Sequence, residues 1–137
     1  MSDALHEDSR HRRPHPQPMA APFLEFDLTR ELEQLYREPE WTTGQNSKTL
    51  VKYADFRIVL TALRAHARIP EHRNEGRISI HTVRGHIRMR ALGRTFDLAA
   101  GSLLALDQGL SHDVEALEDS AFLLTIAWPV RNEKQAG

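Results

Sequence analysis

Histidine is the residue type in this chain best suited to chemistry, since the sequence has eight histidines and no cysteine. An imidazole can bind a transition metal, carry a proton or accept a hydrogen bond. His72 lies in the segment 69–74, which leads through an apolar run to Gly85. His112 ends a second segment, 101–112, in which a glycine, a short apolar run and a polar turn precede it. The lack of cysteine excludes a disulfide framework, a thiolate metal site and a cysteine nucleophile.

The two segments resemble the two sequence motifs of the cupin family, small β-barrels that often hold a metal on histidines inside the barrel. Gly101, Gly109 and His112 follow the second motif at its spacing. Asp107 stands where proline is usual, and Ala116 where asparagine is usual. The likeness covers roughly residues 49 to 128 and is to small single-domain cupins of the cupin 2 conserved-barrel type. It implies an all-β fold, a double-stranded antiparallel barrel (jelly roll) with one N-terminal helix.

The first motif is matched only in part. Counted back from Gly85, His72 takes the first histidine position, Asn74 the second, and Ile78 the position of the glutamate. The resemblance therefore implies a ligand pocket of His72, Asn74, Ile78 and His112 from which the carboxylate has been lost. Isoleucine cannot bind a metal, and an amide oxygen is a weak ligand for transition metals. His72 and His112 are thus the candidate ligands for a divalent transition metal (Fe, Mn, Ni or Zn).

Two further histidines are alternatives to consider. His81 should point away from the pocket if Ile78 points into it, because successive side chains of a strand face opposite sides. A bulge would reverse that direction and allow a triad of His72, His81 and His112. His66 has the same parity as His72, but six residues of strand span roughly 20 Å. We therefore expect His66 at the rim or in a turn.

Strands must position these residues, and from residue 49 onward the chain reads as short runs of β-branched, apolar and aromatic residues separated by turn residues. No alternation of strands with helices suggests a parallel sheet, so the pattern favours a sandwich or barrel. The expected strands are 49–53, 56–64, 68–72, 77–83, 86–91, 95–98, 102–106, 111–117 and 121–128.

The residues before the barrel have a different composition. The first 22 residues are polar and interrupted by prolines, which predicts disorder. Helical spacing of leucines predicts a helix within 23–41, with Asp27 or Thr29 as its N-cap and Pro39 ending it. A polar connector should follow over 41–47. The expected organisation is a disordered tail (1–22), a helix and connector (23–48), the barrel (49–130) and a C-terminal tail (131–137).

Charge and hydropathy limit the partners. The 18 basic and 19 acidic side chains nearly balance, and the arginines are scattered along the strands, so nucleic-acid binding is not expected. No apolar run approaches a membrane span, and the N-terminus lacks the apolar core of a signal peptide. We therefore expect a soluble, cytoplasmic protein with a small-molecule ligand. The resemblance also implies a homodimer, with 49–53 and the helix as candidate contact elements.

Three functions remain open at this point. The favoured one is non-catalytic binding of a small ligand, with a divalent metal as one form of it, around His72 and His112. The alternative is a metal-dependent cupin enzyme of dioxygenase or isomerase type, which needs a third ligand that the sequence does not place. A barrel used mainly for association is the third. Fold alone does not decide among them, and no catalytic residue is assigned.

Overall fold

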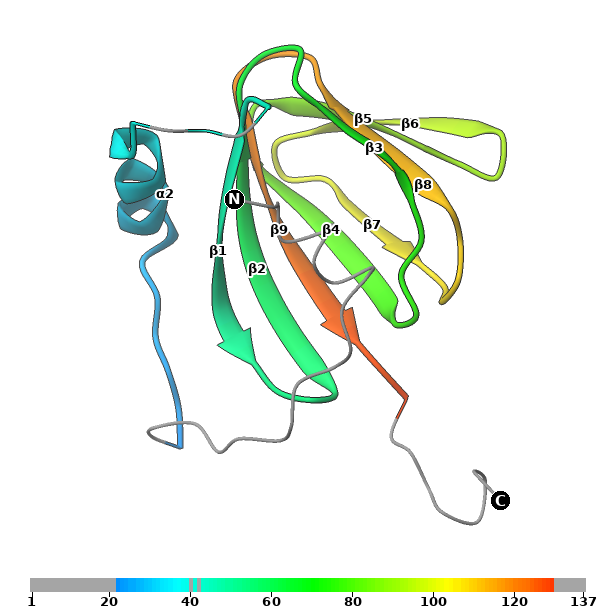
Figure 1. Ribbon diagram of the computed structural model, residues 1–137, viewed down its shortest axis with the longest axis horizontal. Coiled ribbons are helices and arrows are strands. Elements are labelled where there is room, and N and C mark those ends of the chain that lie inside the picture. The colour runs from blue at the N-terminus through cyan, green and yellow to red at the C-terminus, as the bar shows by residue number, and fades with distance from the viewer. Residues whose placement is uncertain (1–21, 40, 42, 130–137) are drawn as a thin grey trace.

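The computed structural model describes residues 22–39, 41 and 43–129. Within them the chain forms two antiparallel sheets and a single helix, as Figure 1 shows. One sheet has the strand order β1-β2-β9-β4-β7, and the other β3-β8-β5-β6. The expected tails fall mostly on residues 1–21 and 130–137, outside the described part. The elements are α2 (Leu28–Arg37), β1 (Gln45–Lys52), β2 (Phe56–Leu63), β3 (Arg68–His72), β4 (Arg77–Arg84), β5 (His86–Ala91), β6 (Arg94–Ala99), β7 (Leu103–Leu106), β8 (His112–Ala116) and β9 (Ser120–Ala127).

This arrangement confirms the all-β jelly roll expected from the sequence, with all nine strands present. One boundary is wrong: β1 begins at Gln45, so the last three residues of the expected connector are strand. Their polarity is misleading, because Asn46 is buried and its amide nitrogen donates to the carbonyl oxygen of Leu35 at 3.2 Å. Asn46 thus lies in the sheet and hydrogen-bonds to the C-terminal end of helix α2.

Short connections at one end of the barrel fix which strands face each other. Residues 64–67, Gly85, 100–102 and 117–119 join β2 to β3, β4 to β5, β6 to β7 and β8 to β9. Each of these connections crosses from one sheet to the other. Strand β2 therefore lies across from β3, and β9 across from β8. We call the opposite end, which carries residues 73–76 and 107–111, the loop end.

Gly85 shows how tight the short-connection end is. Its φ is +78°, and a Cβ atom there would lie 2.3 Å from the carbonyl oxygen of Asp119. The hydroxyl of Ser120 accepts a hydrogen bond from the backbone N–H of His86 at 3.0 Å, which holds the start of β9 to the start of β5. The glycine of the first motif is thus required by close approach of two backbones.

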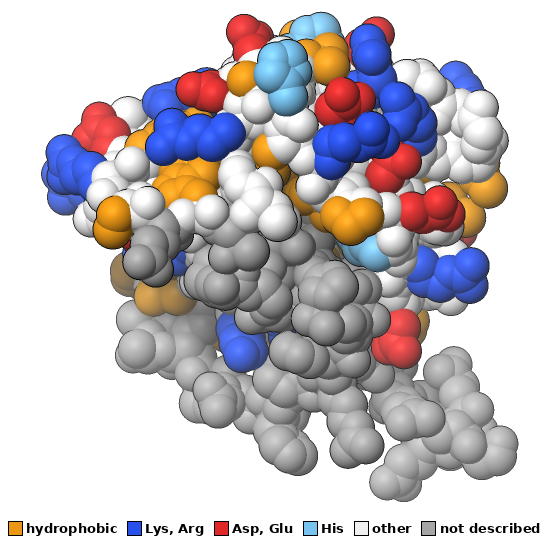
Figure 2. Space-filling view, turned by 45° about the horizontal axis from the view of Figure 1, so that its top comes forward, with side chains coloured by type: hydrophobic (Ala, Val, Ile, Leu, Met, Phe, Trp, Pro, Cys, Tyr) orange, Lys and Arg blue, Asp and Glu red, His pale blue; other side chains and the backbone are white. Residues whose placement is uncertain are grey.

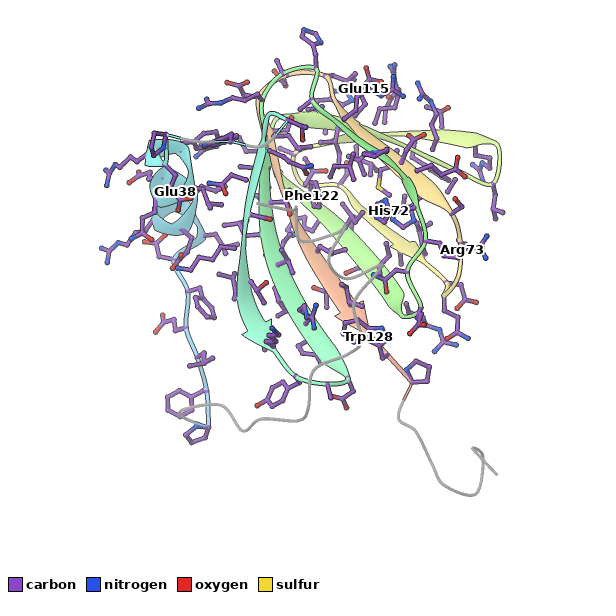
Figure 3. The ribbon with its side chains drawn as sticks, viewed as in Figure 1. Glu38, His72, Arg73, Glu115, Phe122 and Trp128 are labelled. Carbon is purple, nitrogen blue, oxygen red and sulfur yellow. The ribbon has the colours of Figure 1, made fainter. Side chains whose placement is uncertain are left out.

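The side chains that face inward from both sheets form the main hydrophobic core. Alternation is regular: in β4, Ile78, Ile80 and Thr82 are buried while His81 is exposed. Phe122 and Trp128 point inward from β9 and its end, as Figure 3 shows. The interior is therefore filled largely by aliphatic and aromatic side chains.

Helix α2 packs on the outer face of the five-stranded sheet. Asp27 is its N-cap, since the carboxylate accepts from the N–H of Arg30, and this confirms one of the two expected caps. Leu32 and Leu35 are buried against Leu60 and residues on β9. No helix among the described residues is long and apolar enough to cross a membrane.

Candidate functional site

His72 and His112 lie side by side inside the loop end of the barrel. They are directly paired residues of β3 and β8, and their ring centroids are 4.3 Å apart with the planes tilted by 59°. Figure 3 shows His72 between the sheets and Arg73 directed away from them. The two imidazoles that the resemblance placed in one pocket are thus brought together, although 40 positions separate them in the sequence.

Each ring is held in the same way, by the backbone carbonyl two residues before it. The Nδ1 atom of His72 lies 2.9 Å from the carbonyl oxygen of Pro70, and Nδ1 of His112 lies 2.9 Å from that of Leu110. A carbonyl oxygen can only accept, so Nδ1 carries the proton in both residues. In the neutral ring the other nitrogen, Nε2, is then an acceptor with a free lone pair.

Neither Nε2 atom has a partner within the described part of the molecule. Both are buried, and neither has a hydrogen bond. Burial lowers the pKa of the His112 imidazole, and the neighbouring His72 lowers it further, against the opposing effects of the Leu110 carbonyl and Asp113. His112 is therefore kept neutral, which is the form that can bind a metal or accept a hydrogen bond.

Asn74 and Ile78 complete the set expected from the sequence, and both are buried. The side-chain oxygen of Asn74 already accepts from the N–H of Gly76 at 2.9 Å, and its backbone oxygen accepts from Gly109 at 2.8 Å. Asn74 thus ties the two loops of the loop end together. Ile78 belongs to the inner core and pairs with Leu106 on the neighbouring strand.

The other two histidines do not join the pair. His81 is exposed on the outer face of β4, opposite to the inward Ile80 and Thr82, so no bulge turns it inward and the triad with His72 and His112 is not formed. His66 lies in the turn between β2 and β3, where its φ is +71° and its side chain is exposed. The expected turn position of His66 is confirmed.

His72 and His112 offer two imidazole nitrogens, which is fewer than the full ligand set of a metal site. The described residues contain no group of three or more His, Cys, Asp or Glu side chains that could hold a metal ion. The donor type fits a first-row transition ion, because imidazole nitrogen is a ligand that such ions prefer. An ion bound by His72 and His112 would have to take its other ligands from water or from a small molecule.

Sequence reasoning missed Arg57, a buried cation on the inner face of β2. Its side chain is 7 % exposed, and its guanidinium carbon lies 5.2 Å from the centroid of the Trp128 ring. The alternation of side chains along β2 indicated this position. Arg57 lies an even number of residues from Val59, Thr61 and Leu63, which face inward. Most other arginines of the strands are exposed, as expected for a solvated sheet face.

Charge on the outer face of the four-stranded sheet is locally balanced. Arg88 pairs with Asp97 at 3.0 Å, and Arg90 lies 3.7 Å from Glu115. Figure 2 shows acidic and basic side chains mixed over the face that comes forward in that view. Basic and acidic side chains therefore lie beside one another on this face rather than in separate patches.

Comparison with known proteins supports the fold alone. No protein-family model and no curated protein sequence matches the chain. A conserved protein of unknown function from Streptococcus pyogenes superposes with a TM-score of 0.66 at 21% identity, covering 88% of this chain and 100% of that one. A cupin superfamily protein from Desulfitobacterium hafniense has a TM-score of 0.61 at 15% identity, covering 87% and 97%. A salicylate 1,2-dioxygenase from Pseudoaminobacter salicylatoxidans, bound to gentisate, has a TM-score of 0.60 at 14% identity, covering 71% and 28%.

The strand order and these superpositions define the class: the chain folds as a small cupin-type domain with one helix packed on its outer face. Other solved structures with this fold include an RmlC-like cupin and a cupin-2 domain protein, both from Shewanella frigidimarina. Proteins with this fold therefore include both an enzyme and proteins of unknown function, so activity has to be argued from the residues of the site.

Proposed function

We propose that the protein binds a small ligand inside the loop end of the barrel, through the Nε2 atoms of His72 and His112. One observation carries the proposal: two adjacent imidazoles are oriented by the backbone so that their Nε2 atoms are buried and both keep a lone pair without a hydrogen bond. An unpaired buried polar atom costs about 1–3 kcal/mol. A ligand that satisfies both atoms would recover this free energy.

The chemistry of the pair limits the ligand. Because both Nε2 atoms are acceptors in the neutral rings, the ligand must present hydrogen-bond donors or a Lewis acid. A divalent transition metal is one such ligand, held by His72 and His112 and completed by donors from outside the chain. The surrounding side chains, among them Ile78 and Val114, are apolar and suit the body of a small organic molecule.

Binding is favoured over catalysis by what surrounds the pair. Ile78 is buried where the motif has a carboxylate, and the oxygen of Asn74 is engaged by Gly76. The described part of the chain thus adds no third His, Cys, Asp or Glu to the two imidazoles in a group that could hold a metal ion. The runner-up, a metal-dependent enzyme of dioxygenase or isomerase type, would need such a third protein ligand.

Residue-specific NMR of the histidine nitrogens during a Zn²⁺ titration tests the proposal. Before zinc is added, His72 and His112 should show the Nδ1–H tautomer, and zinc should then shift both Nε2 resonances in a saturable way. His72→Ala and His112→Ala should each abolish the shift at the remaining partner, while His81→Ala, on the outer face, should leave it unchanged. A dominant Nε2–H tautomer, or zinc shifts at other histidines only, would overturn the proposal.

A further inference from the structure

Strand β3 contains a β-bulge directly before His72. Ile69 and His72 both pair with residues of β8, and β3 has two residues between them where β8 has only one between their partners. Two residues of one strand opposite one residue of its neighbour are the mark of a bulge. The first of the two is Pro70, which has no N–H group to donate to a ladder and is therefore tolerated at such a position.

The bulge decides which way His72 faces. Ile69 lies three residues before it, and in a regular strand residues three apart face opposite sides of the sheet. Because Ile69 is buried in the core, a regular β3 would turn the His72 ring outward. The extra residue reverses that direction, and Nε2 of His72 is buried beside the His112 ring. The histidine pair therefore exists only while the bulge is kept.

Backbone pairing holds this part of β3 weakly. Within the described residues β3 is an edge strand of its sheet, with β8 as its hydrogen-bonded neighbour. The bulge interrupts the ladder to β8 between Ile69 and His72. Another contact is therefore needed to keep the end of β3 in place.

One side-chain hydrogen bond supplies that contact. The hydroxyl of Ser111 donates to the carboxylate of Glu71, which is the second residue of the bulge. Glu71 and Ser111 each lie between a histidine and the carbonyl group that binds the ring of that histidine. Segments 70–72 and 110–112 thus have the same arrangement, and the hydrogen bond joins them at their middle residues.

We propose that Glu71 and Ser111 are the positioning residues of the histidine pair. Their hydrogen bond keeps the bulge in the register that turns His72 inward, and it fixes the two ring-binding carbonyls relative to each other. The proposal rests on the function proposed above, because it concerns the same two imidazoles. Without the bond, fewer molecules hold both Nε2 atoms toward one site, and the apparent affinity for a ligand that needs both falls by the same factor.

Zn²⁺ titrations of the full chain, followed by NMR of the histidine nitrogens, test the proposal. Glu71→Ala and Ser111→Ala should each weaken zinc binding about fivefold, which corresponds to one hydrogen bond of about 1 kcal/mol. Before zinc is added, each variant should also show a smaller fraction of the Nδ1–H tautomer at His72, which a loss of stability alone does not cause. The double variant should bind zinc no more weakly than either single variant, because both changes remove the same bond.

Glu71→Gln separates positioning from charge. Glutamine keeps a side-chain oxygen that can accept from Ser111 but carries no charge, so this variant should bind zinc almost as well as the wild type. Asp97→Ala is the matched control, since Asp97 is an exposed carboxylate of the same sheet and accepts from Arg88. It should leave zinc affinity and the His72 tautomer unchanged. Far-UV circular dichroism of every variant checks that the barrel is intact.

Three results would overturn the proposal. The alanine variants could bind zinc as well as the wild type with an unchanged His72 tautomer, or the double variant could show the sum of both losses. Glu71→Gln could also bind as weakly as Glu71→Ala while Ser111→Ala loses nothing, and Glu71 would then act through its charge. Failure of the proposed function is distinct: the wild type then shows no zinc shift at His72 or His112, and the tautomer populations still test the positioning role.

Discussion

The outer cluster, which comprises the buried side chains between helix α2 and the five-stranded sheet together with Tyr36, Trp41 and Asn46, has its polar groups hydrogen-bonded. At the loop end of the barrel, two buried imidazole nitrogens are left without a hydrogen bond. Under the helix, Asn46 donates to Leu35 and Glu38, the Trp41 indole N–H donates to the Glu38 carbonyl oxygen, and the Tyr36 hydroxyl donates to Ser120. Inside the barrel, His72 and His112 keep their Nε2 atoms unpaired. One region is built for stability, and the other retains an unfavourable arrangement that a ligand would relieve.

This difference concerns free energy as well as geometry. Each unpaired buried acceptor costs about 1–3 kcal/mol, which is a large share of the stability of a small domain. Natural proteins keep such costs mainly at functional sites. Substitutions in the outer cluster should therefore lower stability, whereas substitutions of the histidine pair should lower binding while stability changes little.

The largest expected loss follows from Leu35→Ala in the outer cluster. Leu35 is 2 % exposed and lies between the helix and the sheet, so the substitution leaves a cavity. The free energy of unfolding should fall by about 2–4 kcal/mol in urea denaturation. Glu33→Ala, on the exposed side of the same helix, should change it by less than about 0.5 kcal/mol. A loss below 1 kcal/mol for Leu35→Ala would show that α2 is not a tightly packed part of the domain.

Asn46→Ala should cost somewhat less, about 1–3 kcal/mol, because it leaves the carbonyl of Leu35 without its side-chain donor at a buried helix end. Thr49→Ala, at an exposed position of the same strand, is the control for lost β-propensity. Thermal unfolding of the two variants measures the difference. If the two variants lower the midpoint of thermal unfolding equally, the hydrogen bonds of the Asn46 amide add nothing to stability beyond the strand preference of the residue.

His112→Leu should change the free energy of unfolding by less than about 1 kcal/mol in either direction. It loses the hydrogen bond to the Leu110 carbonyl and also removes an unpaired nitrogen from an apolar interior, and these effects oppose each other. Binding of Zn²⁺ at His72 should nevertheless be lost. A destabilisation as large as that of Leu35→Ala would mean that His112 is a structural residue, and would remove the contrast between the two regions.

The sequence was sufficient for the elements that depend on local pattern. Strand alternation and turn residues predicted all nine strands, and the cupin resemblance placed His72 and His112 together because its motifs encode spacing from glycines. The start of β1 was missed because Gln45 and Asn46 are polar and yet buried, through a helix end that no local pattern reveals. Arg57 was missed because an arginine is normally exposed, and only knowing which face of β2 is internal shows that this one is not.

The smallest expected effect is on the pH dependence of stability, and it separates the two regions without a ligand. Burial lowers the pKa of folded His112 below its usual 6.5, so in mildly acidic solution the unfolded chain binds a proton that the folded chain does not. Stability should therefore fall as the pH decreases through 6.5 and should level off below the folded pKa. His112→Leu removes this contribution, at most about 1.4 kcal/mol per pH unit, whereas His81→Ala on the outer face should retain it.

Urea unfolding at a series of pH values between neutrality and mild acid measures how steeply the free energy of unfolding of each variant depends on pH. Identical slopes for wild type and His112→Leu would mean that the imidazole is not kept neutral by burial, and that the interior of the loop end is as well solvated as the surface.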